Sequence, residues 1–147
     1  GVAGPPRMAV VIQELVDADC AGVLFTVNPA TGADERVIEA AWGLGEAVVA
    51  GLVTPDRYRL RRGGAVLERT VGRKEVAIRP APGGGTIEVR VPAARARAAC
   101  LDRTALRQLD DLASRCEDGL ATAADLEWAF SRSRLFLLQR REVTRRR

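Results

Sequence analysis

The strongest constraint on the fold is a succession of short segments that are rich in β-branched and apolar side chains and are separated by turn residues. Segments of this length are typical of β-strands, and the Gly, Pro, Asn and Asp residues between them favour turns. Only one stretch shows the three- and four-residue spacing of apolar side chains that is typical of an amphipathic helix. The pattern therefore predicts an α+β domain, mostly antiparallel sheet with few helices.

In the first third of the chain two predicted strands, over residues 8–15 and 22–27, are short, β-branched and mostly apolar, as expected for strands that are buried on both faces. A third strand is predicted over residues 36–41. The turn 43–46, Gly-Leu-Gly-Glu, leads into a predicted short helix over residues 47–51, with Gly51 as its stop.

From residue 57 onward the pattern predicts a β-meander followed by one helix and a final hairpin. Strands are expected over residues 58–61, 66–70, 75–79 and 86–91, with a hairpin turn at Gly63-Gly64. The helix can be capped by Asp102 or Thr104. Its apolar stripe consists of Leu106, Leu109, Leu112, Ala113 and Cys116, and the hairpin strands are expected over residues 124–130 and 135–141.

Composition excludes several kinds of chemistry. The 147 residues suffice for a single core, and they contain no histidine, which excludes an imidazole base, a zinc-histidine site and a phosphohistidine in this chain. The three cysteines fit no metal-binding spacing, so we expect reduced thiols in a cytoplasmic protein. The sequence shows no apolar run of the ~20 residues that a membrane span needs.

The terminal hairpin carries the most specific prediction, because strand alternation decides which side chains share a face. A three-residue loop over residues 132–134 would pair Glu127 with Gln139 and Asp125 with Arg141. These four polar groups would then line one face. A two-residue loop would instead put Glu127 beside Leu138 and split the polar set, so the three-residue loop is favoured.

On the reverse face, the same register would pair Trp128 with Leu138 and Phe130 with Phe136, which forms an apolar surface suited to packing under the helix. The polar face suits Mg²⁺ and phosphate, because Mg²⁺ prefers oxygen ligands and an arginine fork fits a phosphate. Asp125 would hold the Arg141 guanidinium in place. The alternative is a half-solvated hairpin with polar pairs that contribute only ~0.2–1 kcal/mol each to the sheet.

Three further features each have a structural and a functional interpretation. The Gly43–Glu46 turn is either a plain turn or a phosphate contact. Gln13, in an apolar segment, is either a satisfied core amide or a ligand. The C-terminal region holds seven arginines in residues 131–147, which gives the chain its positive charge, and is either a solvated tail or a nucleic-acid site; we favour the solvated tail.

The segments MAVVIQELV, AGVLFTVNPATG, AWGLGEAVVAGLVTPDRY and DLEWAF followed by LLQRREVT together resemble the ATP-binding domain of the phosphoenolpyruvate synthase, pyruvate phosphate dikinase and rifampin phosphotransferase family. The resemblance covers residues 8–144 and implies the C-terminal subdomain of an ATP-grasp nucleotide-binding domain. Residues 1–7 are then a leader or a truncated junction, and residues 145–147 a basic tail.

Carried over residue by residue, the resemblance implies that Glu127 and Gln139 hold Mg²⁺-ATP and that Arg141 contacts phosphate as the catalytic group. Asp125 belongs to the same Asp-x-Glu motif and is included in the nucleotide site. The family's Val-Gln hinge matches Ile12-Gln13, so that Gln13 and the backbone of Glu14 and Leu15 would face the adenine. For Gly43–Glu46 the implied role is mainly architectural, with Glu46 near the nucleotide.

The sequence also departs from the family pattern. The family's proline after Gln-x-Arg is Glu142 here, and the Gly-x-Pro-Gln run before Asp-x-Glu is replaced by residues 121–124, Ala-Thr-Ala-Ala. The half of the nucleotide domain that carries a phosphate-binding Lys and Arg would precede residue 1, and a phosphocarrier histidine domain would lie on the same or another chain.

Two functional hypotheses follow. In the first, the chain is the Mg-ATP-binding part of a dikinase-type phosphotransferase that hands phosphate from ATP to a carrier histidine on another domain. In the second, it is a non-catalytic fragment or interaction module that keeps the fold and docks on the N-terminal half. Neither a nucleic acid nor a membrane is expected as a partner.

Overall fold

The computed structural model describes residues 8–118 and 123–143. They form the mostly antiparallel α+β fold that the sequence predicts. The elements in chain order are β1 (Cys20–Phe25), β2 (Glu35–Trp42), α1 (Glu46–Val49), β3 (Asp56–Arg61), β4 (Ala65–Thr70), β5 (Val76–Pro80), β6 (Thr86–Arg90), α2 (Ala93–Ala96), α3 (Arg103–Glu117), β7 (Ala124–Ser131) and β8 (Arg134–Glu142).

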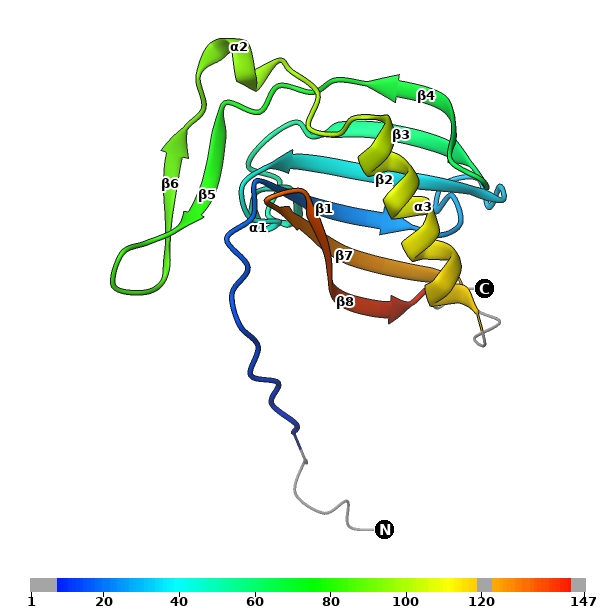
Figure 1. Cartoon of the computed structure of the whole chain (residues 1–147), viewed down its shortest axis with the longest axis horizontal. Coiled ribbons are helices and arrows are strands. Elements are labelled where there is room, and N and C mark those ends of the chain that lie inside the picture. Colours follow the sequence, from blue (N-terminus) through cyan, green and yellow to red (C-terminus); the bar gives the residue numbers. More distant parts are fainter. Residues whose placement is uncertain (1–7, 119–122, 144–147) are drawn as a thin grey trace.

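The described strands form one large sheet and one small one. The large sheet is antiparallel with the order β4-β3-β2-β1-β7-β8, so the terminal hairpin lies against β1, at the start of the chain's regular structure. Strands β5 and β6 form a separate two-stranded arm that projects from one end of the large sheet (Figure 1). The predicted strands from residue 22 onward and the predicted long helix are all confirmed.

One face of the large sheet is covered by α3 (Figure 1). The helix begins where predicted, since the Asp102 carboxylate accepts a hydrogen bond from Ala105 N at 2.8 Å. Its leucine stripe packs on Tyr58, Leu126, Trp128 and neighbouring side chains in the main core. A fully buried arginine, Arg36, reinforces the contact by donating to Asp110 of the helix at 3.2 Å.

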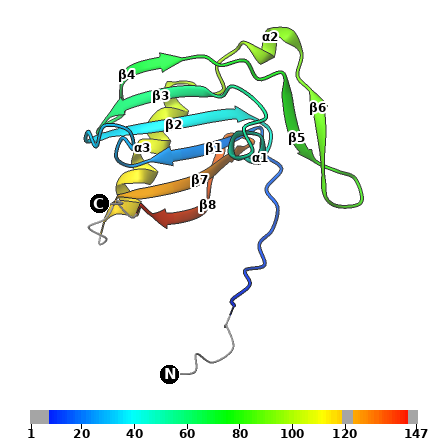
Figure 2. The ribbon, with the colours of Figure 1, turned by 180° about the vertical axis from the view of Figure 1, so that it is seen from behind.

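The opposite face of the sheet, seen in Figure 2, carries the short α1 and the chain that precedes β1. Small residues fill this second core: Ala18, Ala21, Ala47 and Ala129 are fully or almost fully buried against one another. Gly43 is required here, because it has a φ of +78° and a Cβ on it would lie 2.3 Å from the carbonyl oxygen of Ile78. That close approach fixes the β5–β6 arm beside the Gly-Leu-Gly-Glu turn.

A buried polar network anchors the β5–β6 arm to the large sheet. Lys74, the chain's single lysine, forms an ion pair with Asp56, and both side chains are completely buried. The Asp56 carboxylate also accepts from Gly72 N at 2.9 Å, Cys100 N at 2.7 Å and the Tyr58 hydroxyl at 3.2 Å. One carboxylate therefore joins β3, the chain leading into β5 and the chain leading into α3.

The segment over residues 8–15 differs from its prediction as a buried strand. It has no strand partner among the described residues and leaves the sheet as an extended, exposed segment (Figure 1). Val10 is 78% exposed and Ile12 is 97% exposed. The β-branched pattern indicates a segment that favours pairing with another strand, but no such strand lies within the described residues.

The described residues include no helix long and apolar enough to cross a bilayer.

Candidate functional site

The hairpin of β7 and β8 brings the predicted polar residues together, although by a different construction. The turn has two residues, Arg132 and Ser133, both with positive φ (49° and 65°), and not the three predicted. The register then shifts by one residue between Glu127 and Trp128, which is a β-bulge at Leu138. The extra residue restores the pairs predicted for the polar side chains.

Beyond the bulge, Glu127 pairs with Gln139 and Asp125 pairs with Arg141, as the sequence predicts. The apolar pairs are wrong by one residue: Trp128 lies opposite Leu137 and Phe130 opposite Leu135. Leu138 consequently lies in the second core beside Ala129 instead of under α3, and Trp128 and Phe130 occupy the α3 face as predicted.

The polar cluster is held by Arg141. Its Nη2 donates to Glu127 Oε1 at 2.6 Å and lies 3.4 Å from Gln139 Oε1. The side chains of Arg141 and Glu127 are 55% and 29% exposed, so this pair contributes only ~0.2–1 kcal/mol to stability. The prediction that Asp125 holds the guanidinium is wrong, because Arg141 reaches past its direct neighbour to Glu127.

Asp125 is left with an unusual environment. Its Oδ1 is buried and finds no hydrogen-bond partner among the described residues. A buried carboxylate oxygen without a donor is unfavourable by ~1–3 kcal/mol or more. The site therefore retains unused capacity to accept a donor or a cation.

A hollow of about 440 Å³ lies over this cluster, on the face opposite α3. The residues before β1 form one side of it, and β7, β8, α1 and the start of β6 form the others. Its lining includes Gln13, Glu14, Leu15, Glu46, Thr86, Glu127, Leu138 and Arg141. The fold thus brings together the residues predicted at the two ends of the chain. Asp125 and Gln139 flank the cluster without lining the hollow.

The remaining predicted residues have clear positions. Gln13 is exposed and lines the hollow, so it is not a satisfied core amide. In the Gly43–Glu46 turn, the Gly43 N–H donates to Asp19 O at 3.0 Å and the Leu44 N–H to Ile78 O at 2.9 Å, so these groups serve the fold and not a phosphate. Glu46 lines the hollow. Its Oε2 lies 3.4 Å from the Thr86 hydroxyl.

One residue that lines the hollow, Thr86 at the start of β6, escapes prediction. Arg79 of β5 does not line the hollow, but it donates to the carbonyl of Ala18 at 2.7 Å, which ties the arm to the segment leading into β1. Both contacts depend on where the β5–β6 arm lies relative to the chain before β1. The sequence shows a hairpin at this point, but no local pattern says what the hairpin touches.

The donor set fits Mg²⁺. Glu127 and Gln139 present a carboxylate and an amide oxygen from paired positions on one face, and Mg²⁺ commonly takes one or two protein ligands together with water and phosphate oxygens. Within residues 8–118 and 123–143, no group of three or more His, Cys, Asp or Glu side chains is arranged to hold a metal. A cation here would therefore depend on ligand oxygens for most of its coordination.

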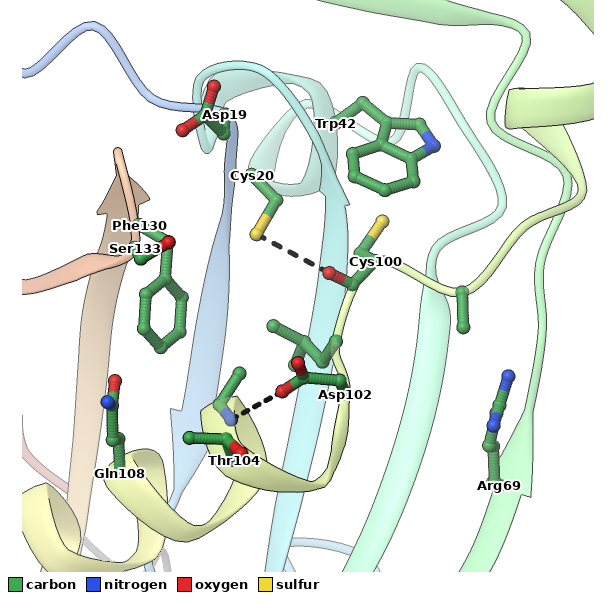
Figure 3. Close-up of a pocket in the computed structure, with 13 residues that line it drawn as sticks. Asp19, Cys20, Trp42, Arg69, Cys100, Asp102, Thr104, Gln108, Phe130 and Ser133 are labelled. Atoms are coloured by element: carbon green, nitrogen blue, oxygen red, sulfur yellow. Dashed lines mark hydrogen bonds between the residues drawn. The ribbon is translucent and has the colours of Figure 1, made fainter.

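A larger hollow of about 610 Å³ lies on the α3 side of the sheet (Figure 3). Trp42, Phe130 and Cys20 line it, together with the capping residue Asp102. None of the residues singled out for nucleotide chemistry lines this hollow. Cys20 is free, as the sequence predicts, and burial raises the pKa of its thiol to about 12, which keeps it protonated and unreactive.

Comparison with known protein families places the chain in one of them. The model of the pyruvate phosphate dikinase AMP/ATP-binding domain matches residues 4–147. The chain belongs to this family. This match confirms the resemblance that the four sequence segments indicate.

The chain is also similar to individual proteins. The chain is 42% identical over 138 residues to a probable phosphoenolpyruvate synthase of Methanothermobacter thermautotrophicus, 41% identical over 139 residues to the prodigiosin synthesizing transferase PigC of Serratia marcescens, and 35% identical over 139 residues to a rifampicin phosphotransferase of Streptomyces sviceus. These alignments cover 93%, 93% and 94% of this chain but only 20%, 16% and 16% of the relatives. The chain therefore corresponds to about a fifth or less of each relative.

Proposed function

We propose that residues 8–144 form the Mg-ATP-binding subdomain of a dikinase-type phosphotransferase, which hands phosphate from ATP to a carrier histidine on another domain. The carrier must lie elsewhere, because this chain contains no histidine. Phosphoenolpyruvate synthase and rifampicin phosphotransferase among the relatives support a phosphotransferase. Residues 1–7, interpreted as a leader or a truncated junction, and residues 145–147, interpreted as a basic tail, lie outside the described residues.

The observation that carries the proposal is the shared hollow. Glu127 and Arg141 of the terminal hairpin line the same cavity as Gln13 and Leu15, more than a hundred positions earlier in the sequence. The lining combines apolar residues such as Leu15 and Leu138 with the charged Glu127 and Arg141, which suits a ligand that carries both an aromatic base and phosphates. The base would contact the segment around Gln13, Leu15 and Leu138, and the phosphates would lie beside Arg141.

In this site Mg²⁺ would neutralise phosphate charge and polarise the bond to the transferred group. Glu127 and Gln139 would hold the cation, and Arg141 would direct its guanidinium at a phosphate oxygen. Asp125 would shape the charge around Arg141. Catalysis by these residues is positioning and charge stabilisation, with no covalent bond to this chain.

We further propose that the N-terminal half of the nucleotide domain covers the exposed segment over residues 8–15. The segment has a strand-forming sequence, and Met8, Val10 and Ile12 are all at least three-quarters exposed. An added strand or sheet edge would bury these side chains and use their backbone hydrogen bonds. The same observation supports the alternative function, an interaction module that keeps the fold without catalysis.

The test is ATP binding by calorimetry, with and without Mg²⁺, for the protein and for Glu127→Ala and Arg141→Ala. We expect Mg²⁺-dependent binding that weakens about tenfold or more in each variant, since each loses a charge-assisted contact. Glu142→Ala, on the same strand but outside the hollow, is the matched control. Unchanged affinity in both site variants would eliminate the site assignment.

The interaction module makes a different prediction. It requires tight association with the N-terminal half of the domain and no ATP binding by the resulting complex. Analytical ultracentrifugation of the two halves, followed by calorimetry with Mg-ATP, separates the two functions.

A further inference from the structure

The Arg141 guanidinium has two carboxylates within its range on β7. In strand register Arg141 is directly opposite Asp125, where paired Cβ atoms are ~4.5–5.5 Å apart. Its Nη2 nevertheless crosses diagonally to Glu127 Oε1 at 2.6 Å. Asp125 keeps a buried Oδ1 with no hydrogen-bond partner in the described chain. The nearer carboxylate in register is thus the one without the arginine.

The observed pairing can be exchanged easily. The Arg141–Glu127 pair is solvent-exposed and weak, so little is lost when it opens. In the proposed function Glu127 is also a cation ligand, and a cation and a guanidinium compete for the same carboxylate oxygens. A displaced Arg141 can turn to Asp125 by side-chain rotation alone, because the two residues already face each other across the hairpin.

We propose that Asp125 is a positioning residue that receives Arg141 when a cation takes Glu127. This inference rests on the proposed function. Without a cation, Arg141 neutralises Glu127; with one, Arg141 pairs with Asp125 and its remaining N–H groups are free for phosphate oxygens. The exchange couples cation binding to the placement of the phosphate-binding group, and only hydrogen bonds are made and broken.

The first test needs no nucleotide. Arginine Nε–Hε resonances are recorded by NMR for the full chain, and the Arg141 signal is assigned by its loss in Arg141→Lys. Glu127→Gln removes the competing charge while keeping the shape, so Arg141 should move to Asp125. Asp125→Asn should therefore shift the Arg141 resonance strongly in the Glu127→Gln background and only slightly in the unaltered chain.

The Arg134 resonance serves as the internal control, because its guanidinium lies 5.0 Å from the Phe136 ring centroid, in a contact that none of the variants alters. An Arg141 resonance that is insensitive to Asp125→Asn in the Glu127→Gln background would overturn the inference.

The second test adds Mg-ATP. We expect it to move the Arg141 resonance of the unaltered chain toward its position in Glu127→Gln, and Asp125→Asn to weaken Mg-ATP binding about tenfold, the ratio for one charge-assisted hydrogen bond. If Mg-ATP binds neither the unaltered chain nor its complex with the N-terminal half, but the Asp125 dependence in Glu127→Gln is present, the exchange stands and the proposed function fails. If Mg-ATP binds and leaves the Arg141 resonance in place, the exchange is wrong and the proposed function survives.

Discussion

Replacing Lys74 with Met tests whether its buried ion pair with Asp56 anchors the β5–β6 arm to the large sheet. The substitution keeps most of the side-chain stem but removes the cation. The fully buried Asp56 carboxylate then keeps only its three neutral hydrogen-bond donors. Breaking a buried pair from one side typically costs ~3–5 kcal/mol, a large part of the ~5–15 kcal/mol that stabilises an ordinary domain. With a urea slope of ~2 kcal/mol/M, the unfolding midpoint should fall by about 2 M.

The assay is urea unfolding followed by tryptophan fluorescence. Arg73→Met is the matched control, because Arg73 is the adjacent residue and its ion pair with Glu75 has partners that are 64% and 60% exposed. The control should lose at most ~1 kcal/mol. Asp56→Asn combined with Lys74→Met should recover part of the loss by removing the stranded charge. A Lys74→Met midpoint no lower than that of Arg73→Met would refute the reasoning.

Three other expectations concern individual residues. Cys20 should resist thiol reagents at pH 8 and react only after unfolding, because burial raises the pKa of its thiol to about 12; labelling in the native protein, read by mass spectrometry, would contradict this. Gly43→Ala should lower thermal stability by ~1–3 kcal/mol more than Gly32→Ala, since both have positive φ but only Gly43 meets another backbone. Burial opposes ionisation of Glu117, yet hydrogen bonds from two arginines lower the pKa of its carboxyl in the folded protein below 4.5. Its stabilising contribution is therefore complete above about pH 6 and is lost as the pH falls through the folded pKa, so the stability deficit of Glu117→Gln should shrink in acid; a deficit that stays constant down to about pH 3 would contradict this.

Much of the fold is local and could be read from the sequence. The strands from residue 22 onward, the Asp102 cap and the Gly63-Gly64 turn follow from alternation, capping chemistry and glycine conformation. The pairing of Glu127 with Gln139 and of Asp125 with Arg141 was also predictable, because the residues lie on adjacent strands.

The errors arise where the outcome depends on contacts that a local pattern does not contain. The segment over residues 8–15 has a strand sequence, but a strand needs a neighbour. The bulge at Leu138 does not follow from the sequence pattern, because a three-residue loop and a two-residue loop with a bulge give the same polar pairs. The diagonal choice of Glu127 by Arg141 depends on side-chain reach across a twisted hairpin, which strand register alone does not settle.

The bulge at Leu138 has a consequence for insertions and deletions in this hairpin. It separates the strand pairs near the turn from those near the cavity, so that the two groups are out of phase by one residue. At constant chain length, the extra residue can lie either in the bulge with a two-residue turn or in a three-residue turn without a bulge, and Gln139 and Arg141 stay opposite their present partners in both cases. Deletion of Leu138 alone should also keep these pairs, because Leu137 and Gln139 then follow each other opposite Trp128 and Glu127. Among homologous hairpins of equal length, a longer turn is therefore expected where the bulge is absent, and the polar pairs can stay constant while the turn changes.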